Sequence, residues 1–378
     1  MDHALSADQE LFVETTRRFL EATTPLQEVR RLHAEVPEGF DRKVWRQAAE
    51  LGWTAMLVPE ADGGGSVSGH GVLDVVLVAE ELGRLVGPGP LLPVNVVADA
   101  VARRGTEAQR RAILPGLLSG EAVATWAFAE PAGTWDASGV EAAAVRDGGH
   151  FVLTGTKSFV QDAGVADVFL VTARTGGGLT QFVVPAGAPG LRVTPLGSLD
   201  LTRRFGTVHL DGVRLDLDAV LGEVDGAAAD VERQLQVALV IQAAETVGAI
   251  GRVFDMTLEY AQDRVAFGRP LASYQALKHR FADLRTWLEA CRATAVAAAR
   301  AVDEEAPDAA ELVSVAKAYI ADRSPAVVQD CVQLHGGIGV TWEHDLHLYL
   351  RRVTQNAVLY GSVRQHQERL ATFIGMAG

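Results

Sequence analysis

Apolar and polar residues alternate at helical spacing over the first third of the chain. In LSADQELFVETTRRFLEA, apolar residues recur every three or four positions behind Ser6, a residue suited to cap a helix. The segments DRKVWRQAAELGW, GVLDVVLVAEELGRL and TEAQRRAILPGLLSGE continue this pattern, and three glycines from Gly63 mark a loop between them. The pattern predicts an N-terminal helical domain over residues 1–122.

The pattern changes over residues 123–225. Short runs rich in β-branched and aromatic residues appear there, namely HFVLTGTKSFV, ADVFLVTAR, LTQFVVP, LRVTPLG and TVHLDGVRL. Glycine and proline separate these runs at near-regular spacing, which is typical of short strands joined by turns. We therefore predict a middle antiparallel, barrel-like β domain.

Helical spacing returns over residues 226–378, in longer segments. Four helices are predicted, and short links between them favour a four-helix bundle. The fold class is accordingly mainly α with an inserted β domain. The predicted helices of this last domain cover about 227–263, 274–303, 308–335 and 344–374.

The composition of the chain argues against several kinds of binding partner. The formal net charge of −14 disfavours nucleic acid or an anionic membrane as a partner, although a local basic cluster can still bind a small anion. The two cysteines, Cys291 and Cys331, form no disulfide framework and no CxxC metal pair. The N-terminus is acidic and polar, unlike a signal peptide, and no run reaches the ~18 apolar residues of a membrane span without a charge or Gln. We expect a cytoplasmic protein with no metal site.

One carboxylate stands out within an apolar stretch. Glu245 is the only charge between Arg233 and Arg252, inside LQVALVIQAAETVGAIG. Glutamate is almost never fully buried unless it is paired or has a chemical role. Two hypotheses remain open at this point: a catalytic carboxylate, or a structural one paired with Arg252 or Gln242.

Several motifs together resemble the acyl-CoA dehydrogenase family over some 300 residues. They are LGWTAMLVPEADGGG, AEELGR, WAFAEP, FVLTGTKSFV, DRVAFGRPLASYQALKHRFADL and QLHGGIGVTWEHDLHLYLRR, in that order. The resemblance implies a helical domain, a β domain and a four-helix bundle, in agreement with the pattern above. It also implies FAD, an acyl-CoA thioester substrate, an electron-transfer flavoprotein or similar acceptor, and a homo- or hetero-oligomer built as a dimer of dimers.

The resemblance implies contacts with FAD for two groups of residues. In the first group, family members use an Arg and a Gln for the pyrophosphate and adenosine side, and a QxxGG segment reaches the FAD of a neighbouring subunit. The second group flanks the flavin ring, and here the chain departs from better-known members, which have Thr or Ser at 129, Thr at 161 and a small residue at Trp135. The first group is Arg264, Phe267, Gln275, Gln333, Gly336 and Gly337, and the second is Phe128, Ala129, Gln161 and Ser362.

The family's catalytic base has no obvious counterpart. Many members carry it as Glu in a YEG triplet, and NAVLYGSVR places Tyr360 there, beside Gly361. A phenol with an ordinary pKa of about 10 is a poor base at neutral pH. A second family position falls on Ala238, and Glu245 lies two helical turns beyond it. We therefore predict Glu245 as the base, with Tyr360 and Gly361 supplying a backbone N–H to the thioester oxygen. Two alternatives stay open: a catalytically silent partner subunit of a heteromeric dehydrogenase, and a flavin oxidase.

Overall fold

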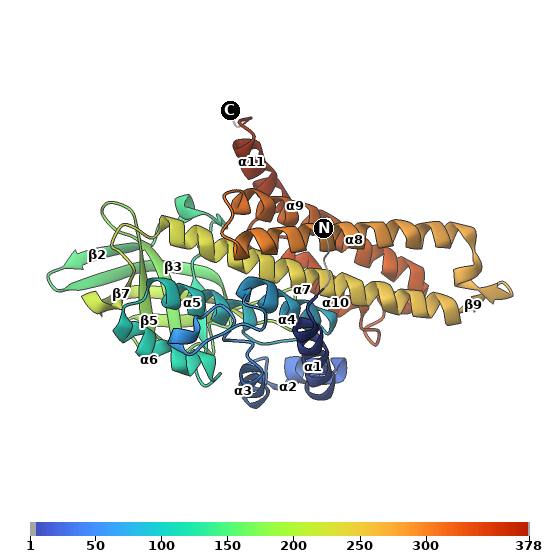
Figure 1. Cartoon of the computed structure of the whole chain (residues 1–378), viewed down its shortest axis with the longest axis horizontal. Helices are drawn as coiled ribbons and strands as arrows, with labels where there is room; N and C mark the ends of the chain where they lie inside the picture. Colours follow the sequence, from blue (N-terminus) through green and yellow to red (C-terminus); the bar gives the residue numbers. More distant parts are fainter. Residues whose placement is uncertain (1–4, 377–378) are drawn as a thin grey trace.

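The computed structural model describes residues 5–376 and contains the three regions in the predicted order (Figure 1). The cap at Ser6 is confirmed, because its side chain accepts from the backbone N–H of Gln9. The N-terminal region consists of α1 (Ala7–Thr23), α2 (Leu26–Glu35), α3 (Arg42–Glu50), η1 (Glu60–Asp62), α4 (Gly71–Arg84), α5 (Leu91–Arg104) and α6 (Glu107–Leu118).

The middle region is one eight-stranded sheet in the order β6-β7-β3-β2-β4-β5-β8, with β1 paired to β4. Most neighbours are antiparallel, as predicted, but β1 runs parallel to β4 because it enters the sheet from α6 rather than through a hairpin. No pairing of β6 with β8 is found within residues 5–376, so the sheet is open rather than a closed barrel. The strands are β1 (Ala124–Ala127), β2 (Ala143–Asp147), β3 (His150–Gln161), β4 (Val168–Arg174), β5 (Leu179–Pro185), β6 (Leu191–Leu196), β7 (Phe205–Asp216) and β8 (Val220–Leu221).

The C-terminal region is a helical bundle built on α7, whose residues are buried along most of its length. By length and composition α7 could cross a membrane, but 94% of its most apolar window is buried inside the protein, as in a core helix. A small hairpin, β9 (Val265–Ala266) and β10 (Arg269–Pro270), follows α7. The helices are α7 (Ala228–Asp263), α8 (Gln275–Asp303), α9 (Ala309–His335), α10 (Leu346–Asn356) and α11 (Val363–Phe373).

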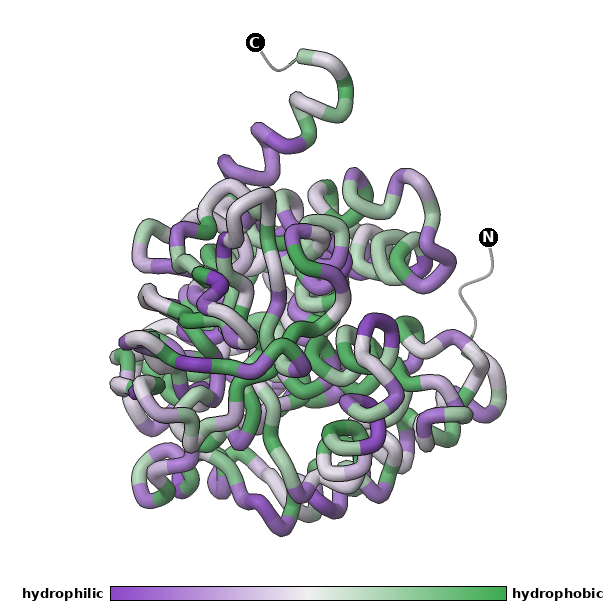
Figure 2. The backbone as a smooth tube through the Cα atoms, turned by 90° about the vertical axis from the view of Figure 1, so that its left-hand side faces the viewer, coloured by the Kyte–Doolittle hydropathy of each residue, from purple (hydrophilic) through white to green (hydrophobic). Residues whose placement is uncertain are grey.

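The last predicted helix, 344–374, is two helices separated by a turn. Tyr360 and Gly361 have positive φ angles of 61° and 112°, which an α-helix does not accommodate. Ser362 then starts α11 with a capping box shared with Gln365. The turn redirects the chain, and α11 projects from the body of the molecule (Figure 1, Figure 2).

Candidate functional site

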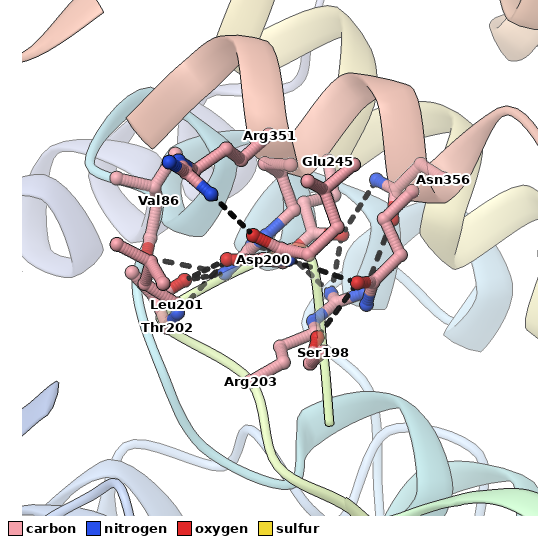
Figure 3. Close-up of polar contacts among 12 residues, drawn as sticks. Val86, Ser198, Asp200, Leu201, Thr202, Arg203, Glu245, Arg351 and Asn356 are labelled. Carbon is pink, nitrogen blue, oxygen red and sulfur yellow. Dashed lines mark hydrogen bonds and ion pairs between the residues drawn. The ribbon is translucent and has the colours of Figure 1, made fainter. Parts of the chain in front are cut away.

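Glu245 lies near the middle of α7 and is 4% exposed. Arg203 donates to both of its carboxylate oxygens and Arg352 donates to Oε1. Asn356 adds a longer contact, from Nδ2 to Oε2 at 3.3 Å. Two guanidinium groups and one amide therefore surround this carboxylate (Figure 3).

The same cluster contains a second carboxylate, Asp200. Arg352, which is fully buried, bridges the two acids: it donates to Asp200 as well as to Glu245. It also donates to the carbonyl oxygens of Val86 and Gly87, at 3.2 and 3.3 Å. Burial alone would raise the pKa of Asp200, but the positive charge of Arg352 holds that pKa below its usual range. Two positive and two negative groups thus balance within the interior.

The cluster joins segments that are distant in the chain. Arg203 and Asp200 come from the loop between β6 and β7, Glu245 from α7, and Arg352 from α10. The cluster therefore fastens the β domain to the bundle.

The structural partners of Glu245 differ from those expected. Arg252 lies instead 3.7 Å from Glu259, and the side-chain oxygen of Gln242 accepts from Lys317, so both expected partners were wrong. The physical reason is that Arg252 is two helical turns away from Glu245, about 10 Å along the axis. Whether Glu245 also acts as a base stays a prediction.

Tyr360 is buried in an aromatic group. Its ring centroid lies 5.1 Å from that of Trp135 and 6.2 Å from that of Trp126, and Trp126 stacks on Phe128 at 5.0 Å. Burial raises the pKa of the Tyr360 phenol above its ordinary value of about 10, although the nearby positive charge of Arg203 opposes this rise. The phenol is therefore protonated at neutral pH and unable to accept a proton.

Gly361 is required by its surroundings. Its φ is +112°, and a Cβ placed on it would lie 2.6 Å from Nε2 of His366. The turn at Tyr360–Gly361 can therefore close only on a residue without a side chain.

A cavity of about 540 Å³ lies where the β6–β7 loop faces the α10–α11 turn. This size is within the range of small-molecule and cofactor sites. Predicted cofactor residue Ser362 lines it, together with Trp135 and Phe159. The other lining residues are Gly133, Leu196, Gly197, Ser198, Leu199, Phe205, Thr354, Gln355, Val358, Leu359 and Gln365.

The surroundings of this cavity fit a flavin ring, which is flat, aromatic and polar along its edges. Trp135 and Phe159 offer aromatic surface for the faces of such a ring. Two buried polar atoms nearby, Nε1 of Trp126 and Oε1 of Gln161, have no hydrogen-bond partner. The other end of the Gln161 amide donates to Asp162 at 3.0 Å, so its free oxygen points away from that carboxylate. Phe128 and Ala129 are buried beside this aromatic group.

Asp162 itself was not singled out by the sequence. Burial raises its pKa to about 6, against the weaker effects of Gln161 and of Arg203. Its residue type gave no signal, because only the fold removes this aspartate from water.

The remaining predicted cofactor residues lie at the other end of the molecule. Arg264 ends α7, Phe267 forms the tip of the β9–β10 hairpin, and Gln275 begins α8. The second segment, Gln333, Gly336 and Gly337, lies at the end of α9.

Contacts between neighbouring residues bring these two segments together, including an ion pair between Arg280 and Asp330. The ring of Tyr260, four residues before Arg264, stacks on His335 with centroids 4.5 Å apart. This end of the bundle, marked by β9, is opposite the β domain marked by β2 (Figure 1). Phe267 is 99% exposed there, and Val340 and Trp342 are exposed on the adjoining segment. Exposed apolar residues of this kind typically mark an interaction surface.

Comparison with known proteins identifies relatives along nearly the whole chain. Three family models match: acyl-CoA dehydrogenase N-terminal domain at residues 6–121, middle domain at 125–213 and C-terminal domain at 225–374. Acyl-CoA dehydrogenase IpdE2 of Mycolicibacterium smegmatis is 32% identical, over 97% of this chain and 98% of its own length.

Two solved structures are similar in fold and sequence. A variant of the Tcur3481–Tcur3483 steroid ACAD is 30% identical with a TM-score of 0.87, covering 97% of both chains. The ChsE4–ChsE5 complex from Mycobacterium tuberculosis contains a chain that is 29% identical with a TM-score of 0.89, covering 99% of both.

Proposed function

The chain belongs to the acyl-CoA dehydrogenase family, and on that premise we propose that it serves acyl-CoA dehydrogenation as the base-lacking subunit of a heteromeric enzyme. Members of this family are oxidoreductases acting on CH–CH groups, and FAD is their cofactor. The overall reaction would be α,β-dehydrogenation of an acyl-CoA thioester to the trans-2-enoyl thioester. Electrons would pass to a separate acceptor such as an electron-transfer flavoprotein. When bound, FAD supplies the acceptor for the substrate's β-hydrogen.

The observation that carries this proposal is the state of the candidate bases. A general base needs a proton-accepting atom within hydrogen-bond reach of the substrate. Glu245 is surrounded by two guanidinium groups, and the Tyr360 phenol is held protonated by burial. No residue lining the 540 Å³ cavity, among those the structure describes, carries a carboxylate or an imidazole. A partner chain would therefore have to provide the base.

The placement of the cofactor residues supports a shared assembly. Phe128 and Ser362 lie at the junction of the β domain and the bundle, whereas Arg264 and Gln333 lie at the far end of the bundle. One cofactor touching both groups needs two chains. The resemblance predicts that the Arg264 and Gln333 segments serve different cofactors, but their adjacency favours a single one. The relatives add support, since one solved neighbour is the ChsE4–ChsE5 complex.

The decisive experiment compares the chain alone with the chain in complex with a second acyl-CoA dehydrogenase subunit with which it co-purifies. Each preparation, supplied with FAD, is mixed anaerobically with acyl-CoA esters that include fatty and steroid side-chain thioesters, and flavin bleaching is followed. We expect bleaching only in the complex. Bleaching by the chain alone would contradict the proposal, and oxygen consumption without an added acceptor would instead indicate an oxidase.

Glu245→Gln separates the two hypotheses for this residue within the same experiment. Gln is nearly isosteric, so the carboxylate is lost with little change in packing. If Glu245 is structural, the variant complex bleaches at nearly the wild-type rate and the protein is destabilised by about 3–5 kcal/mol. If Glu245 is the base, bleaching falls by about 10²–10⁴-fold. Asp255→Asn, a change at a half-exposed carboxylate on the same helix, is the matched control.

A further inference from the structure

Lys317 is a buried lysine on α9 without an acidic partner. Among residues 5–376 no carboxylate pairs with it, and it is 6% exposed. Its Nζ donates to three oxygens: Oε1 of Gln242 at 2.7 Å, the carbonyl of Leu359 at 2.8 Å and the carbonyl of Asn356. A lysine ammonium has three N–H donors, so each acceptor receives one. Burial lowers the pKa of Lys317 to about 7, because the buried site disfavours the charged ammonium.

Two of these acceptors lie at and just beyond the end of α10, because Asn356 is its last residue and Leu359 is in the turn that follows. The last carbonyl groups of a helix lack partners within the helix and must be satisfied from elsewhere. Here a side chain from a different helix, α9, satisfies the carbonyls of Asn356 and Leu359. Immediately after them, Nε2 of His366 lies 2.9 Å from the carbonyl oxygen of Tyr360 and therefore carries the proton in that contact. The backbone from 356 to 360 is thus fixed by side chains from two other elements.

This fixed backbone forms one wall of the cavity. Val358, Leu359 and Ser362 line it, whereas Lys317 does not. The turn also holds Tyr360 at a φ of 61°, a conformation that a non-glycine residue keeps only when its surroundings enforce it. We propose that Lys317 is a positioning residue, which sets the shape of the flavin cavity by holding the carbonyl groups of Asn356 and Leu359.

Ser324 provides a matched control on the same helix. It lies seven residues after Lys317, is fully buried, and lines the same small gap of about 10 Å³ beside Gln242. Its hydroxyl makes no hydrogen bond in the structure. A change at Ser324 therefore alters the packing of α9 at the same gap without releasing the carbonyl groups of Asn356 and Leu359.

The test combines hydrogen exchange with FAD titration of the full chain, in its complex if it purifies as one. Lys317→Met fills the same space without donors. We expect the amides of residues 356–362 to exchange about ten-fold faster in this variant, while amides in the middle of α7 stay protected. FAD affinity should fall by about ten-fold, and Ser324→Ala should change neither quantity.

Two results would overturn the proposal. One is unchanged exchange of 356–362 in a folded Lys317→Met protein; the other is faster exchange with FAD affinity within about two-fold of wild type. If Lys317→Met does not fold, Lys317→Gln carries the test, because its amide keeps two donors and should give an intermediate exchange rate. The proposal rests on the proposed function only in assuming that the cavity binds FAD. Hydrogen exchange is measured without FAD. A wild-type protein that binds no FAD would therefore count against the proposed function alone.

Discussion

The two ends of the bundle differ in which residues they bury and which they expose. At the junction with the β domain, Glu245, Asp200, Arg203 and Arg352 are buried, and each has partners of opposite charge within the chain. At the hairpin end, Phe267 is 99% exposed and touches little of its own chain. The charges of the first region are therefore paired within one chain, whereas the second region leaves a large apolar side chain exposed. This difference separates the residues that stabilise the single chain from those that the proposed function assigns to an assembly.

The largest effect is expected from removing one charge of the buried cluster at the junction with the β domain. Arg352→Met removes the residue that bridges both acids, so Asp200 loses its salt bridge and Glu245 keeps only Arg203. We expect the free energy of unfolding to fall by about 3–5 kcal/mol, measured by urea denaturation. Arg351→Met, at the neighbouring position with only one long contact to the Leu199 carbonyl, should change it by less than about 0.5 kcal/mol. Similar losses of unfolding free energy in Arg352→Met and Arg351→Met would contradict a stabilising role for the buried charges.

The helices could be predicted from sequence because their signals are local. The apolar spacing placed α7, α8 and α9 within a residue or two of their observed bounds, and the lone charge at Glu245 indicated a special carboxylate. The break before α11 was missed although a signal existed: Ser362 and Gln365 form a capping box that the sequence displays.

The partners of Glu245 could not have been read from the sequence. Arg203 lies 42 residues away and Arg352 lies 107 residues away, and the fold alone brings them together. Asp200 and Arg203 are close in the sequence, yet Asp200 pairs with Arg352 and Arg203 pairs with Glu245. The separation of the predicted cofactor residues between the two ends of the molecule likewise follows from topology rather than from any motif.

A smaller effect concerns the pH dependence of stability. With a pKa of about 6 in the folded protein, Asp162 keeps a proton that the unfolded chain, with an ordinary pKa of about 3.9, has lost over the intervening pH range. Folding takes up that proton, so the free energy of unfolding falls as pH rises from about 4 to about 6.

Asp162→Asn tests this dependence. Relative to wild type, the free energy of unfolding of the variant should increase by up to about 3 kcal/mol as the pH is raised from about 4 to about 7. Urea denaturation at both pH values measures the difference. The carboxylate of Asp167, which is half exposed, serves as the control through Asp167→Asn. A gain that does not change with pH would show that the Asp162 carboxyl is not the titrating group.

The smallest effect is expected at the hairpin end of the bundle. Arg264→Ala removes a predicted contact to the FAD pyrophosphate at the end of α7. Losing a hydrogen bond to a charged group costs roughly 1.5–3 kcal/mol, which lowers FAD affinity by about one to two decades. Fluorescence titration with FAD measures the affinity, and helical content should stay unchanged. Arg285→Ala, at an exposed residue on α8, is the control. Equal affinities for wild type and Arg264→Ala would remove this residue from the site.

The buried cluster has a consequence for how the chain unfolds. Because its four charges come from the β6–β7 loop, α7 and α10, the β domain and the bundle cannot separate without leaving buried charges unpaired. These two regions are therefore one cooperative unit, which should lose its structure in a single transition. An isolated bundle fragment beginning at α7 would keep Glu245 and Arg352 but lack both Asp200 and Arg203, and would be correspondingly less stable than its length suggests.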